Sequence, residues 1–115
     1  MAKFLFVYRN EPNPGAAEPS PEEMQQIMQV WMTWIEGGMK AGWLLDGGDA
    51  LKAEGSVVSP DLTVTDGPYA ESKELVGGYS MVEAADLGAA VELAKTCPVP
   101  ASGGSVEIRE LAGLA

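Results

Sequence analysis

Polar side chains that could perform acid–base chemistry gather in one segment, DGPYAESKEL, which runs from Asp66 to Leu75. A carboxylate held in a pocket could move a proton to or from a small organic acid, and this stretch supplies both carboxylates and an amine. The catalytic candidates are Asp66, Glu71 and Lys73, and the candidate ligand contacts beside them are Tyr69 and Glu74. The alternative is an ordered loop whose charges pair with one another and stabilise a dimer, because the first four residues have ordinary turn chemistry.

A second candidate site is the turn Asp46-Gly47-Gly48-Asp49. Two carboxylates presented at a strand end could hold a cation or aim a base, so we name Asp46 and Asp49 as candidate ligand contacts. The sequence supplies no third or fourth ligand beside them, and divalent cations prefer a richer oxygen cage, so no metal is expected. A plain polar turn is the alternative interpretation.

Aromatic side chains offer a third candidate, the wall of a mostly apolar pocket between a sheet and a helix. The candidate pocket residues are Trp34, Trp43, Tyr79 and Tyr8, and the first two are favoured because nothing in the pattern obliges them to be buried. Trp31 instead lies on the inward stripe of a predicted helix and is expected in the core. The apolar residues at helical spacing are Met24, Ile27, Met28, Trp31 and Ile35.

The composition excludes several kinds of chemistry. The chain has no histidine, which removes Ser/His/Asp and Cys/His catalysis and nearly every zinc site. Its one cysteine, Cys97, is expected to be buried as a small apolar residue, and no cofactor is expected. Seven basic residues against seventeen acidic ones give a net charge of −10, without the basic patch that nucleic acid or an anionic membrane requires. No apolar run is long enough to span a membrane, so a cytoplasmic location is expected.

Apolar periodicity and turn formers predict strands and helices within a single domain of residues 1–115. The expected strands are 3–8, 43–46, 56–59, 62–65, 78–83 and 105–111, and residues 98–104 are expected to be a loop. One helix is expected from its cap at Ser20 to a stop at Gly42, and a second begins after Asp86. Gly37 and Gly38 in the first helix would permit close packing, although a frayed last turn would give the same pattern.

This order is β-α-β, a hairpin, then β-α-β. Without the inserted hairpin it is the ferredoxin-like βαββαβ pattern of an α+β fold. Two helices cover only one face of a four-stranded sheet, so the other face needs a cover of its own. That other face carries some of Phe4, Phe6, Tyr8, Tyr79 and Met81. We therefore expect a homodimer formed through the open sheet face.

The stretch TDGPYAESKELVGGYSMVEAADLGAAVELAKTCP, from Thr65 to Pro98, resembles the family named for its DGPF motif, within the YCII-related proteins. The similarity is looser over the opening strand and helix, the Gly47-Gly48 turn and the closing strand. Two departures, Tyr69 for phenylalanine and Ser72 for threonine, are conservative. The resemblance implies a bacterial, cytoplasmic protein whose ferredoxin-like subunits pair into a dimeric α+β barrel.

The resemblance leaves the activity open, because most members of that family have no assigned one. Distant relatives are thought to use a His–Asp pair, which this chain lacks. Our leading hypothesis is a small organic ligand bound near the DGPY segment, with cofactor-free lyase, isomerase or hydrolase chemistry by Asp or Glu if the protein is an enzyme. The alternative is a non-catalytic binding or regulatory module, for example an accessory to an extracytoplasmic-function sigma factor. A dimer with neither ligand nor activity is a further alternative.

Overall fold

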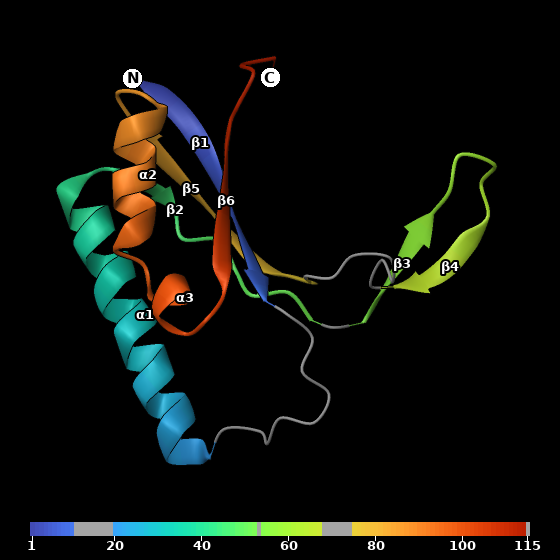
Figure 1. Ribbon diagram of the computed structural model, residues 1–115, viewed down its shortest axis with the longest axis horizontal. Coiled ribbons are helices and arrows are strands. Elements are labelled where there is room, and N and C mark those ends of the chain that lie inside the picture. The colour runs from blue at the N-terminus through green and yellow to red at the C-terminus, as the bar shows by residue number, and fades with distance from the viewer. Residues whose placement is uncertain (11–19, 53, 68–74, 115) are drawn as a thin grey trace.

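The computed structural model describes residues 1–10, 20–52, 54–67 and 75–114, and these residues form six strands and three helices (Figure 1). The strands are β1 (Ala2–Asn10), β2 (Leu44–Asp46), β3 (Gly55–Val58), β4 (Val64–Gly67), β5 (Leu75–Ala84) and β6 (Ser105–Glu110). The helices are α1 (Pro21–Ala41), α2 (Leu87–Lys95) and α3 (Pro98–Ala101). None of these helices is both long and apolar enough to cross a membrane.

Four strands form the main sheet in the order β2-β5-β1-β6, and each neighbouring pair is antiparallel. Without the β3–β4 hairpin, these four are the first to fourth strands of a βαββαβ chain, in the spatial order of a ferredoxin-like sheet. The predicted α+β, ferredoxin-like fold is confirmed. The first strand, β1, is central, because it pairs with both β5 and β6.

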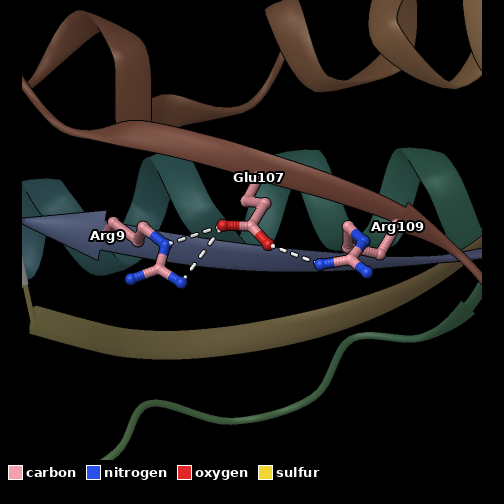
Figure 2. A network of polar contacts seen from close by, with 3 residues as sticks. All are labelled: Arg9, Glu107 and Arg109. Carbon is pink, nitrogen blue, oxygen red and sulfur yellow. Dashed lines mark hydrogen bonds and ion pairs between the residues drawn. The ribbon is translucent and has the colours of Figure 1, made fainter.

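The two faces of the main sheet differ in what covers them. Phe4, Phe6 and Tyr8 alternate along β1 and point toward the helices, where Phe4 and Phe6 are fully buried. Burying each of these side chains contributes about 1.5–3 kcal/mol to folding. Leu5 and Val7 lie between them and point to the opposite face. In Figure 2 no other described helix or strand lies over this face around Glu107. Tyr79 and Met81 pair with Val7 and Leu5 and therefore lie on this open face as well.

Local signals set the ends of the two longer helices. The Ser20 hydroxyl accepts the Glu23 N–H at 3.1 Å and donates to the Glu23 carboxylate at 3.2 Å. The helix ends at Gly42, whose φ of 88° few other residues adopt easily. Asp86 caps α2 by accepting the Ala89 N–H at 2.8 Å. The predicted caps and stop are confirmed.

The two glycines near the end of α1 have different surroundings. A Cβ on the buried Gly38 would lie 2.8 Å from the Trp43 ring, so this glycine permits the close packing that was expected. A Cβ on Gly37 would meet nothing within 4 Å. Close packing therefore explains Gly38 but not Gly37.

The inserted hairpin forms a separate two-stranded sheet, β3–β4, which Figure 1 shows projecting away from the main sheet. Its predicted turn is present, because the Leu62 N–H donates to the Ser59 carbonyl at 2.8 Å. The expected loop 98–104 was wrong for its first four residues, which form the short helix α3. Proline fits this position because the N–H groups of a first helical turn have no partner within the helix.

Candidate functional site

A cavity of about 420 Å³ lies between α1 and the end of the main sheet where β1 finishes and β5 begins. This volume is within the range of small-molecule sites. The α1 wall consists of apolar side chains, namely Met24, Ile27, Met28, Trp31, Met32 and Ile35. The facing wall consists of Tyr8 and Asn10 from β1, the turn 47–50 and residues 77–79 of β5, with Val99 and Ser102 completing the lining.

The α1 wall exists because the first half of the helix extends past the sheet (Figure 1). Residues 21–30 are all exposed, and Met24 and Met28 keep 46% and 56% of their surface accessible. Met24, Met28 and Met32 follow one another at intervals of four residues, so they form a single row along the helix. The apolar stripe that predicted the helix is therefore only partly core, because its first turns line the cavity.

Tyr8 anchors the facing wall through a buried chain of hydrogen bonds. Its hydroxyl donates to Ser80 Oγ at 2.7 Å, and Ser80 in turn donates to the Gly47 carbonyl at 2.8 Å. Burial raises the pKa of the Tyr8 phenol well above its usual range, so the group stays protonated at neutral pH. Its ring meets the Trp31 ring edge-on, with centroids 5.1 Å apart. Tyr8 thereby links the helix wall to the turn after β2.

The turn after β2 is held tightly against β5. The Asp46 carboxylate accepts the Gly48 N–H at 2.8 Å, and the Tyr79 N–H donates to the Asp49 carbonyl at 3.3 Å. Gly48 has a φ of 67°, and a Cβ there would overlap the carbonyl oxygen of Tyr79. Glycine is therefore required at this position both by conformation and by the close approach of the two backbones.

Asn10 fills a space that two other glycines leave open. A Cβ on Gly77 would lie 2.9 Å from its side-chain nitrogen, and one on Gly104 would lie 2.6 Å from its side-chain oxygen. The amide therefore lies over both backbones at the end of β1, beside the cavity. Sequence reasoning did not single out Asn10. The glycines that follow the DGPY segment and open β6 are the signal that could have found it.

The structure separates the residues that the sequence nominated. Asp49 and Tyr79 line the cavity, although the pairing of Tyr79 with Val7 places the Tyr79 side chain on the open face. Asp46, the last residue of β2, precedes the turn and does not line the cavity. Trp34 and Trp43 pack against each other with ring centroids 5.2 Å apart, away from the cavity lining.

None of the candidates from the DGPY segment is among the described residues that line the cavity. Asp66 is exposed on β4 of the hairpin and does not line the cavity. Tyr69, Glu71, Lys73 and Glu74 lie outside the described residues.

The cavity lining carries little charge. Within the described part of the chain, Asp49 is its one ionisable carboxylate, and neither lysine nor arginine contributes to it. No group of three or more His, Cys, Asp or Glu side chains in that part could hold a metal ion. Cys97 is buried, and burial raises the pKa of its thiol, which opposes formation of a nucleophilic thiolate.

A separate polar network lies on the open face of the sheet (Figure 2). The Glu107 carboxylate forms ion pairs with two arginines. Its Oε1 lies 3.1 Å from a guanidinium nitrogen of Arg9, and its Oε2 lies 3.3 Å from one of Arg109. The three side chains are partly exposed, so each ion pair contributes about 0–1 kcal/mol. They place two positive groups on a chain with a net charge of −10.

The sequence model of the YCII-related domain family matches residues 4–113 of the 115-residue chain. The matched range runs from β1 past the end of β6 and so contains the main sheet, the hairpin and every wall of the cavity. A search of curated proteins found no match.

Proposed function

Because the chain belongs to the YCII-related domain family, we propose that it binds a small organic molecule in the cavity between α1 and the main sheet. The observation that carries this proposal is the wall of exposed apolar side chains on α1 facing a polar edge built from Tyr8, Asn10 and Asp49. Binding sites for small molecules have this composition, with apolar walls and few polar groups that fix orientation.

The described residues at and after the end of the DGPY segment support the same proposal. Its last residue, Leu75, pairs with Asn10 at the end of β1, and Asn10 lines the cavity. Gly77 and Gly78, directly after the segment, line it as well. The described residues that follow the motif therefore form part of the proposed binding site.

A catalytic version of the proposal uses carboxylates without a cofactor. Asp66, Glu71 and Lys73 stay its proposed acid–base residues, and Tyr69 and Glu74 its proposed contacts. In this version Glu71→Gln and Asp66→Asn abolish turnover of a small organic acid without unfolding the protein. Retained turnover in both variants would end the catalytic version and leave the binding proposal standing.

Ligand binding is tested with a neutral apolar dye, N-phenyl-1-naphthylamine, whose fluorescence rises in an apolar site. We expect saturable binding with one site per chain. Met28→Trp should weaken it, because the larger ring takes up part of the cavity. Met39→Trp is the matched control, because Met39 is equally exposed on the same helix but does not line the cavity. Absence of saturable binding, or equal binding by the two variants, would overturn the proposal.

We also propose that a second copy of the chain covers the open sheet face. Half-buried apolar side chains, Leu5 and Val7 among them, lie there beside the Glu107 carboxylate and its two arginines. A surface with both signs of charge can match a copy of itself across a twofold axis. The dimeric α+β barrel that the family resemblance implies uses this face.

The alternative function is a non-catalytic module that binds a partner protein, such as an extracytoplasmic-function sigma factor. The hairpin favours it, because Val58, Leu62 and Val64 expose 62–79% of their surface on an element that projects from the sheet. A pull-down that recovers a sigma factor with the native chain, and not with Val58→Ser/Val64→Ser, would support this alternative.

A further inference from the structure

The polarity of the cavity lining indicates which ligands it would accept. Its helix wall is apolar throughout, and the lining residues with polar side chains are Tyr8, Asn10, Asp49, Tyr79 and Ser102. Among the lining residues that the structure describes, only Asp49 is charged at neutral pH. A ligand with a formal negative charge would therefore meet a like charge and no counter-ion in this lining. Burying an unpaired charge against apolar walls is strongly unfavourable.

We propose that the cavity selects a hydrophobic amine, that is, an apolar body carrying a protonated nitrogen that the Asp49 carboxylate holds. This inference rests on the proposed function, because it names the ligand class of the same cavity. It reverses the charge expected for the organic acid that the DGPY segment suggested.

Asp49 lines the cavity, and its carboxylate can accept further hydrogen bonds. One of its oxygens accepts the Ala50 N–H at 2.8 Å. Ala50 forms a bridge with Gly78, so the backbone around Asp49 is tied to β5. An ionised carboxylate offers about four acceptor positions, so this single bond leaves capacity for an ammonium group. A charge-assisted hydrogen bond of that kind is about twice as strong as a neutral one.

The rest of the lining suits the body of such a ligand. The Tyr8 and Trp31 rings line the cavity and are in edge-on contact with each other. The row Met24, Met28 and Met32 supplies flexible, polarisable side chains that adapt to ligand shape. The net charge of −10 also raises the local concentration of cations around the protein.

The test compares three molecules with one skeleton: 3-phenylpropylamine, 3-phenylpropan-1-ol and 3-phenylpropanoate. Each displaces the bound N-phenyl-1-naphthylamine at pH 7, in low and in high salt. We expect the amine to bind about 3- to 10-fold more tightly than the alcohol and the carboxylate to bind most weakly. High salt should narrow the difference between amine and alcohol.

Asp49→Asn should remove the preference for the amine by lowering its affinity to about that of the alcohol. Asp61→Asn is the matched control, since Asp61 also accepts a backbone N–H, from Thr63, but lies in the hairpin turn. It removes the same charge and should preserve the preference. If the dye binds but 3-phenylpropanoate binds as tightly as 3-phenylpropylamine or more tightly, the amine inference alone is overturned. Equal effects of the two substitutions on the preference for the amine would overturn it as well. Failure of the dye to bind would overturn the proposed function and this inference with it.

Discussion

The Tyr8 hydroxyl and the Ser80 hydroxyl lie 2.7 Å apart on adjacent strands of the main sheet, and both side chains are buried. Ser80 is fully buried and donates its own hydroxyl hydrogen to the Gly47 carbonyl, so one serine is the hydrogen-bond partner of two groups. This chain connects the centre of the sheet to the turn that walls the cavity. The turn is therefore held by the core as well as by its own backbone bonds.

Removing the Ser80 hydroxyl should destabilise the protein more than removing the Tyr8 hydroxyl. Ser80→Ala leaves the Tyr8 hydroxyl and the Gly47 carbonyl without this partner, which should lower the free energy of unfolding by about 2–4 kcal/mol. Tyr8→Phe keeps the bond from Ser80 to Gly47 and should cost about 1 kcal/mol. Urea denaturation at unchanged m-value measures both. The double variant should lose less than the sum, because the unpaired phenol is absent. Equal losses in the two single variants would contradict this role for Ser80.

Helix α1 illustrates how far the sequence could predict this structure. Ser20, Glu23 and Gly42 set its ends, and these signals are local, so the bounds could be predicted from neighbouring residues. The strand order followed from the sequence of elements and the helix-covered face. Apolar spacing, however, specifies a face of a helix and not what that face meets. The spacing of Met24 and Met28 predicted the helix, but not the offset of helix and sheet that leaves these residues lining a cavity.

The candidate site was less predictable for a related reason. Asp49 and Tyr79 were nominated and do line the cavity, since each follows or lies in a strand end that the pattern had located. Trp34 and Trp43 were nominated because nothing required their burial, yet they pack on each other. Their pairing depends on the close approach of α1 to β2 at Gly38, which is a tertiary contact and leaves no periodic signal.

Two glycines should respond in opposite ways to alanine. Gly48→Ala places a methyl group against the Tyr79 carbonyl at a positive φ, so we expect a loss of about 2–4 kcal/mol and weaker dye binding. Gly37→Ala adds a methyl group that meets nothing within 4 Å inside a helix, so we expect a gain of about 0.5–1 kcal/mol. Urea midpoints measure both. A gain at Gly48 would show that the turn does not keep the conformation seen here.

Stability should fall in alkaline solution because burial raises the pKa of both Tyr8 and Cys97. At pH 7 both groups are protonated in the folded and in the unfolded chain, so they do not lower the free energy of unfolding. As the pH rises, the unfolded chain loses these protons before the folded chain does. Its cysteine titrates at about pH 8.5 and its tyrosine at about pH 10. The folded chain still holds them, so the free energy of unfolding decreases from about pH 8.5 upward.

Urea midpoints between pH 7 and pH 11 test this dependence. Cys97→Ala should flatten the decrease between about pH 8.5 and 10, and Tyr8→Phe should flatten it above about pH 10. Val58→Ala is a control, because this exposed residue carries no ionisable group and should leave the pH dependence unchanged. An unchanged slope in both test variants would show that other groups dominate the alkaline decrease.

The proposed dimer predicts that a charge at the centre of the open face separates the subunits. Val7 lies in the middle strand opposite Tyr79 and Glu107, so Val7→Glu adds a carboxylate where two sheets would meet and brings it beside Glu107. Because Val7 points away from the buried core, the variant should stay folded. We expect sedimentation velocity to find a dimer for the native chain and a monomer for Val7→Glu, with the same helical circular dichroism. Val58→Glu, on the exposed hairpin, adds the same charge and should remain dimeric. Dissociation by Val58→Glu instead would transfer the interface from the sheet to the hairpin, and a native monomer would remove the dimer altogether.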